Sequence, residues 1–157
     1  MTARLISIGT MLLFGCSSAP QPVAAPPFRS VVDLKQLMEW VIDPAADVVW
    51  ESVKTIATEE GTKEIVPRTQ AEWDAVRNAA ATLAETGNSL MTEVRARDRD
   101  RWMKAARRLV DAAEEALKAA EAKNADSVFA AGGRIYDACA ACHRQYAPQL
   151  NADASAR

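Results

Sequence analysis

The sequence predicts an all-α protein, folded as an antiparallel up-down four-helix bundle. Its composition favours helices over strands, because alanine is abundant while glycine is scarce and aromatic residues make up only 6% of the chain. From Ser30 onward, apolar residues recur at helical spacing in four successive segments, and no stretch alternates with period two. Four helices joined by mostly short connections fold most simply as such a bundle.

Length and charge narrow the class of protein. The chain has 157 residues, which suits one ordinary domain, and it is 49% apolar and 25% charged, as in soluble globular proteins. Its net charge is −2, from 19 basic and 21 acidic side chains. Phosphate binding requires a strongly basic face, so we expect no nucleic-acid partner.

Residues 1–15 are typical of a lipoprotein-type signal peptide. Arg4 precedes an apolar run from Leu5 to Phe14, which as a helix would span about 15 Å, roughly half of a bilayer core. The run is followed by Gly15 and Cys16, and LFGC resembles the bacterial lipobox. That resemblance implies cleavage before Cys16 and a diacylglycerol on its sulfur. Ordinary secretory cleavage a few residues later is the alternative.

Residues 16–29 are predicted to be a lipidated, proline-rich tether. They contain four of the seven prolines of the chain, and such a segment favours extended conformations over helix. Ser17 stands where an aspartate would signal retention in the inner membrane of many bacteria, which favours the outer membrane. We therefore expect an exported protein, anchored by lipid on the periplasmic side, with residues 30–157 forming the bundle.

The first predicted helix begins near Ser30 and is kinked or broken at Asp43-Pro44. Asp43 suits a helix cap and Pro44 suits the first turn of a renewed helix. The apolar stripe continues beyond this interruption, so the element is expected to extend to about Glu60, where Gly61 ends it. The stripe consists of Leu34, Leu37, Met38, Val41, Ile42, Val48, Val49, Val53 and Ile56.

Three further helices follow. The second begins at Thr69, with Glu72 three residues later as a capping box. The third is predicted over Arg101 to Lys123, after a polar junction that offers an aspartate as its cap. The fourth is predicted from Ser127 to about Tyr146, ending at Pro148.

The stretch that carries chemistry is CAACHRQY, residues 139–146. Cys139 and Cys142 are three residues apart, so both thiols project from one side of a helix, and His143 places the only imidazole of the chain beside them. Two thioethers would hold the vinyl groups of a porphyrin while the imidazole reaches its iron. The C-x-x-C-H spacing therefore predicts covalent attachment of one haem c.

Other chemistries use part of this pattern. A thioredoxin-like redox pair also uses C-x-x-C, but in a βαβ setting and at the start of a helix. A zinc site lacks a fourth ligand here, since the chain has no second histidine and its one other cysteine, Cys16, is expected to carry lipid. A disulfide between Cys139 and Cys142 within a helix has poor geometry.

The four predicted helices, with CAACHRQY close to the end of the chain, resemble the class II cytochromes c, the family of cytochrome c prime and its methionine-ligated relatives. The resemblance covers about residues 30–151 and implies a haem between helices at one end of the bundle. It implies that Cys139 and Cys142 are the covalent attachments and that His143 is the proximal iron ligand. Lys35-Gln36 loosely matches an Arg-Gln pair that contacts a haem propionate in the family.

The sixth iron position is left open by the residues. No second histidine exists, and Met1 and Met11 leave with the signal peptide, so Met38, Met91 and Met103 remain. Met91 and Met103 flank the junction between the second and third helices, which suits packing. Met38 lies on the predicted first helix, about where the resemblance places the distal residue of the family, so it is the candidate. A His/Met pair raises the reduction potential and favours electron transfer. In the alternative, Met38 only fills space. If Leu37 or another apolar side chain then covered the iron, a five-coordinate haem would bind nitric oxide or carbon monoxide.

The remaining features suggest a carrier rather than an enzyme. The residues show no nucleophile–base arrangement and no phosphate-binding glycine loop. Partners are expected to be redox proteins of unknown identity and, through Cys16, a membrane. A basic run between Arg95 and Arg108 would dock an acidic redox partner, or it is only a solvated face. The sequence leaves two oligomeric states open: a monomer, or a homodimer formed through helix faces as in the family.

Overall fold

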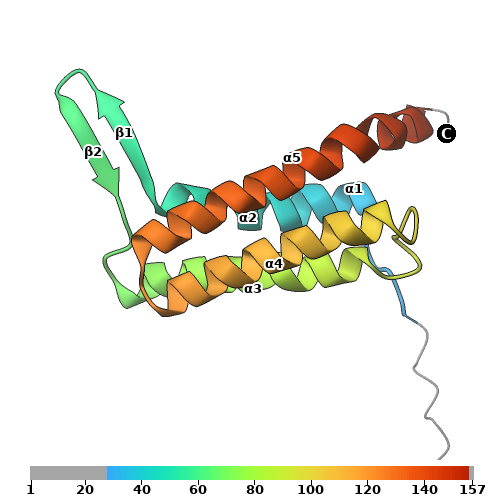
Figure 1. Cartoon of the computed structure of the whole chain (residues 1–157), viewed down its shortest axis with the longest axis horizontal. Coiled ribbons are helices and arrows are strands. Elements are labelled where there is room, and N and C mark those ends of the chain that lie inside the picture. The colour runs from blue at the N-terminus through green and yellow to red at the C-terminus, as the bar shows by residue number, and fades with distance from the viewer. Residues whose placement is uncertain (1–27, 156–157) are drawn as a thin grey trace, which may run out of the picture.

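The computed structural model describes residues 28–155, with side chains described as far as Pro148. The predicted signal peptide, Cys16 and most of the tether therefore lie outside the described residues. The described chain is mostly helical with one small sheet (Figure 1). Its elements, in order, are α1 (Leu34–Leu37), η1 (Met38–Ile42), α2 (Asp43–Ser52), β1 (Lys54–Thr58), β2 (Gly61–Ile65), α3 (Gln70–Leu90), α4 (Arg101–Glu121) and α5 (Ala125–Ser155).

The first helical region is interrupted where the sequence predicted it. A capping box between Asp33 and Gln36 starts α1, and five residues of π-helix, η1, then lead into α2. The N–H of Asp43 donates to the carbonyl of Met38, five residues back. Pro44 is the second residue of α2 and has no N–H to donate to the preceding turn. The interruption is thus a wider helical turn directly before Asp43-Pro44.

The expectation that this helix continues to Glu60 is wrong. Helix α2 ends at Ser52, and β1 and β2 form an antiparallel hairpin in which Lys54 pairs with Ile65. β-branched residues are frequent in both strands, and the turn passes through Gly61, whose φ of 134° is a conformation that side-chain-bearing residues rarely adopt. The valine and isoleucine spacing that suggested a helical stripe therefore spans the end of one element and the start of another.

The remaining helix starts follow their capping residues. Thr69 and Glu72 form the predicted capping box of α3, with reciprocal side-chain to backbone hydrogen bonds. Helix α4 matches its predicted range to within two residues, and Asp98 accepts a hydrogen bond from the N–H of Trp102 in its first turn. Helix α5 extends through Pro148 to Ser155, so the predicted end at Pro148 is wrong. The lost hydrogen bond of one proline does not end this helix.

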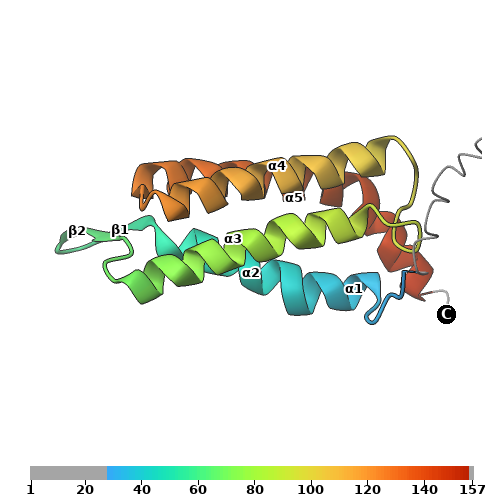
Figure 2. The ribbon, with the colours of Figure 1, turned by 90° about the horizontal axis from the view of Figure 1, so that it is seen from below.

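The long helices lie side by side along the long axis of the molecule, and the hairpin projects from one end (Figures 1 and 2). The contact between α3 and α4 is the most extensive, that between α4 and α5 is nearly as large, and that between α2 and α5 is much smaller. Alanines fill most of the buried positions of α4. Because these side chains are small, α4 can lie close to its neighbouring helices.

Gly87 shows how close the approach between α3 and α4 is. A Cβ atom added there would lie 2.7 Å from Cγ2 of Val110, closer than such atoms are found in proteins. Large buried side chains, among them Leu83, Trp102 and Ile135, fill the rest of the interior. No helix among residues 28–155 is both long enough and apolar enough to cross a bilayer.

Candidate functional site

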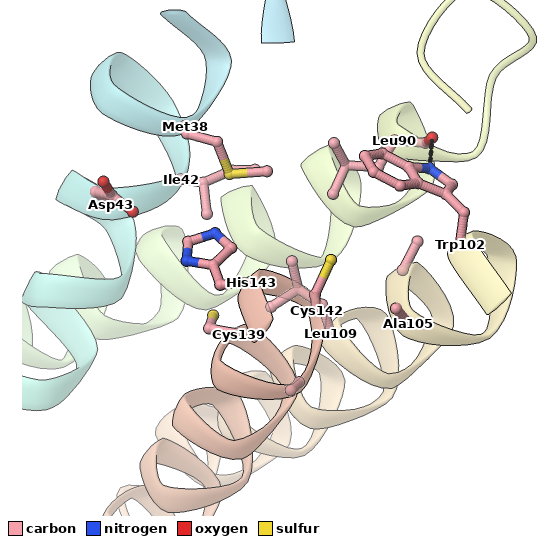
Figure 3. Close-up of a pocket in the computed structure, with 12 residues that line it drawn as sticks. Met38, Ile42, Asp43, Leu90, Trp102, Ala105, Leu109, Cys139, Cys142 and His143 are labelled. Carbon is pink, nitrogen blue, oxygen red and sulfur yellow. Dashed lines mark hydrogen bonds between the residues drawn. The ribbon is translucent and has the colours of Figure 1, made fainter. Parts of the chain in front are cut away.

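A cavity lies at the end of the helices opposite the hairpin. The space inside it that water could occupy is about 30 Å³, and about 450 Å³ is empty when the space open to solvent is counted. Five elements, η1, α2, α3, α4 and α5, line it with mostly apolar side chains (Figure 3). The lining residues are Met38, Ile42, Asp43, Leu90, Trp102, Ala105, Ala106, Leu109, Ala138, Cys139, Cys142 and His143.

Helix α5 contributes the two thiols and the imidazole. Cys139, Cys142 and His143 lie on consecutive turns, so their side chains meet in the cavity as the spacing predicted. Both thiols are partly buried and free, while His143 is exposed at the mouth. Ala138, the residue before Cys139, is buried and also lines the cavity.

The opposite wall contributes a thioether. Met38, the first residue of η1, points into the space that His143 reaches from α5 (Figure 3). Ile42 lies one turn further and lines the same wall. Leu37, its neighbour in sequence, is buried in the core and is not among the lining residues. The wider turn of η1 shifts the helix surface here, so Met38 and Ile42 are the side chains that reach the cavity from this side.

The electrostatics of the cavity keep its thiols protonated. Burial raises the pKa of Cys139 to about 11, with smaller contributions from the nearby carboxylate of Asp43 and from Cys142. Burial alone raises the pKa of Cys142. A redox-active cysteine pair needs a lowered thiol pKa instead, because the thiolate is the nucleophile. The surroundings of Cys139 and Cys142 therefore do not favour thioredoxin-like chemistry.

Two aromatic residues pack against each other beside the cavity, and each makes a hydrogen bond to another group. Trp102 lines the cavity and donates from its Nε1 to the carbonyl of Leu90 at 2.6 Å (Figure 3). The ring of Tyr146 packs edge-on against Trp102, with centroids 4.9 Å apart, and its hydroxyl donates to Asp98. This bond lowers the pKa of Asp98 to about 2 and helps burial to raise that of Tyr146 to about 12.

The structure places the pair proposed for a propionate outside this cavity. Lys35 is exposed and lies 3.5 Å from the carboxylate of Glu39. Gln36 uses its side chain in the capping box with Asp33. Neither residue lines the cavity, so their contact with a cofactor stays a prediction.

One buried cation was not anticipated from the sequence. Arg95 belongs to the basic run that was expected at the surface, yet only 8% of it is exposed. Its guanidinium donates to the hydroxyl of Ser89 and to the carbonyl of Val32, and it lies 5.9 Å from the ring centroid of Phe28. Its Nε has no hydrogen-bond partner among the described residues. Nothing in the local sequence distinguishes Arg95 from its exposed neighbours.

Comparisons with protein-family models, curated proteins and solved structures found no match to this chain. Among the residues that the structure describes, no three histidine, cysteine, aspartate or glutamate side chains are grouped so that they could hold a metal ion by themselves. The chemistry of the cavity therefore has to be argued from its own side chains. They include two neutral thiols, one imidazole, the carboxylate of Asp43 and, on the facing wall, the thioether of Met38.

Proposed function

We propose that this protein is a c-type cytochrome that transfers electrons through one covalently attached haem. The observation that carries the proposal is that Met38 and CAACH, about one hundred residues apart in the chain, line one apolar cavity. The proposal includes an up-down arrangement of α2, α3, α4 and α5, with the cofactor held at one end. The bound cofactor would supply reversible one-electron chemistry at its iron.

The thiols of Cys139 and Cys142 would hold the cofactor covalently. Each S–H would add across one vinyl group, so that a carbon–sulfur bond forms and the proton goes to the other vinyl carbon. This addition needs no oxidant or reductant. It does need two free thiols on one side of a helix, and Cys139 and Cys142 meet that condition. Their apolar surroundings also suit the flat, apolar faces of a porphyrin.

His143 and Met38 would be the axial ligands. The imidazole extends from the turn after Cys139, and the thioether of Met38 enters from the facing wall. A His/Met pair raises the reduction potential and favours electron transfer over ligand binding. A five-coordinate haem that binds nitric oxide or carbon monoxide is the second candidate. It is favoured by Ile42, an apolar side chain on the same wall.

Attachment is tested with protein matured in a host that carries a c-type cytochrome assembly system. We expect coloured protein whose intact mass includes one haem and whose colour resists extraction by acidic acetone. The double variant Cys139→Ser, Cys142→Ser should lose the added mass, while either single variant should keep one thioether and show a shifted haemochrome band. Colourless wild-type protein with the mass of the bare polypeptide would overturn the proposal.

Export and anchoring are proposed from the segment outside the described residues. Cys16 would carry the lipid, so that the bundle is held on the periplasmic side, and Ser17 would direct it to the outer membrane. In membrane fractions, Cys16→Ser should release the protein to the soluble fraction without loss of haem, and Ser17→Asp should move it to the inner membrane. If Cys16→Ser stays in the membrane fraction, the lipid is not attached at that residue.

A further inference from the structure

A second hollow lies on the outer side of α5, near the base of the hairpin. It encloses about 840 Å³, including space open to solvent, and is formed by the end of α2, the start of β1 and one face of α5. It shares no lining residue with the cavity of the two cysteines. We refer to it as the aromatic groove, after the side chains of Trp50, Phe129 and Tyr136 that line it.

The aromatic groove has a floor of glycine and walls of aromatic rings. Phe129 and Tyr136 are seven residues apart on α5, hence on one face, and both are more than 60% exposed. Between them lie Gly132 and Gly133, two adjacent glycines in a helix, each of which costs roughly 1 kcal/mol relative to alanine.

Packing within the described chain explains why position 132 is a glycine, but it does not explain Gly133. At Gly132 an added Cβ would lie 3.3 Å from the indole of Trp50, and the Nε1 of that indole donates to the Gly132 carbonyl at 2.9 Å. Gly132 therefore accommodates Trp50. At Gly133 an added Cβ would meet no atom within 4 Å, so no packing within the described chain accounts for this glycine. The space above Gly133 is open between two exposed aromatic rings.

The rings are held in a defined arrangement. The hydrogen bond to Gly132 fixes the indole of Trp50, and the ring of Tyr136 meets it edge-on with centroids 6.3 Å apart. Aromatic faces carry negative charge density and attract cations, and quaternary ammonium groups are recognised in this way. A groove walled by such rings therefore favours a ligand that is both apolar and positively charged.

The formal charges at the groove agree with this preference. Lys54 and Asp137 are the two charged side chains that line it. The Lys54 ammonium is paired with the carboxylate of Glu51, and Asp137 has neither an ion pair nor a side-chain hydrogen bond among the described residues. An anion would be repelled by Asp137, and a neutral apolar ligand would bury that carboxylate without a partner.

We propose that the aromatic groove binds an organic ammonium ion, with a quaternary or tertiary nitrogen over the rings of Trp50 and Tyr136 and near the Asp137 carboxylate. The apolar part of the ligand would lie on Gly133, against Phe129. This binding does not depend on a haem being present, since the groove and the cysteine cavity have separate linings.

The test compares choline with 3,3-dimethylbutan-1-ol, a neutral molecule of the same shape, on the purified full-length protein by isothermal titration calorimetry. We expect choline to bind with a Kd of about millimolar or below, and the neutral analogue to bind at least about tenfold more weakly. Added salt should weaken choline binding. Equal affinity for the two compounds, or no binding of choline, would overturn the proposal.

Three substitutions locate the site. Asp137→Asn should weaken choline binding about tenfold, and Phe129→Leu and Gly133→Ala should also weaken it, because they remove a wall and raise the floor. Asp126→Asn, an exposed position on the same helix outside the groove, is the matched control and should change nothing. Thermal melts confirm that each variant is folded. If Asp137→Asn keeps the wild-type affinity, the proposal fails.

Discussion

At the scale of single residues, the position of Met38 is what favours iron ligation by a thioether in the proposed function. It is separated from CAACH by most of the chain, yet the two line one cavity, while Leu37 next to it faces the core. Met91 and Met103 also pack against the core, but neither lines the cavity. Of the methionines in the described residues, Met38 alone lies in position to face an iron held by His143.

If the proposed haem is bound with Met38 as its sixth ligand, the Met38→Ala variant should lose the six-coordinate spectrum. We expect the sharp α and β bands of the reduced form to give way to a broad high-spin envelope, and the weak ferric band near the red end to disappear, because no thioether completes the iron. Carbon monoxide should then bind readily. Met103→Ala is the control and should keep the parent spectrum. A wild-type spectrum in Met38→Ala would instead support the five-coordinate alternative.

Asp98 predicts a pH dependence of stability. The hydroxyl of Tyr146 and the backbone N–H of Trp102 hydrogen-bond to its carboxylate and hold its pKa at about 2, below the ordinary 3.8. A carboxyl whose pKa is lowered by folding stabilises the protein above its ordinary pKa, and this contribution disappears as the pH falls through the folded-state value.

Urea unfolding of wild type and Asp98→Asn measures this contribution. At neutral pH the wild type should be the more stable, and the difference should shrink between about pH 4 and about pH 2, the interval set by the ordinary and the folded-state pKa. Asp100→Asn removes a carboxylate from an exposed ion pair with Lys104 and is the control. A difference that stays constant over this interval would show that Asp98 is not the titrating group.

At the scale of elements, capping patterns predicted where helices begin, but the residue pattern did not predict where α2 and α5 end. Thr69 and Glu72 are local signals, and α3 begins where they predicted. The end of α2 could not be found this way, because Val53 and Ile56 fit a helical stripe as well as a strand. The conformation at Gly61, with its φ of 134°, favours the hairpin, and a backbone angle is not visible in a residue pattern.

Two glycine-to-alanine changes, one at the contact of α3 with α4 and one on α5, should change stability in opposite directions. In Gly87→Ala the new methyl would collide with Val110, whose branched side chain has few alternative rotamers. Overpacking costs roughly 1–3 kcal/mol and should outweigh the gain of about 1 kcal/mol in helix propensity. Gly133→Ala meets no neighbour and should stabilise the protein by up to about 1 kcal/mol. Chemical unfolding measures both, and equal shifts would contradict the packing argument.

At the scale of the whole molecule, the sequence anticipated the mostly helical fold and the placement of Cys139, Cys142 and His143 on one side of a helix. It did so because helical periodicity and C-x-x-C-H are local patterns. The aromatic groove and the burial of Arg95 were not anticipated. They depend on Trp50 meeting Gly132, and on Arg95 meeting Val32, across long separations in the chain. Such tertiary contacts leave no periodic trace in a single sequence.

The hairpin should be dispensable for the stability of the helices. Its side chains are exposed over most of both strands, and its strands contact each other rather than the helices. Because Lys54 pairs with Ile65, an Asn-Gly turn could replace residues 55–64 without moving the ends. We expect the free energy of unfolding to change by no more than about 0.5 kcal/mol. Loss of cooperative unfolding, followed by circular dichroism, would show that the hairpin supports the fold.

The small contact between α2 and α5 predicts which helices open locally to solvent most easily. Segments with few tertiary contacts open at a lower free energy than the body of a protein. Helices α3, α4 and α5 share the larger contacts, so the amides of η1 and α2 should exchange with solvent first. If the proposed cofactor is bound, the segment that bears Met38 is then the part of the cavity wall that separates at the lowest free energy cost, so a large flat molecule would enter from that side.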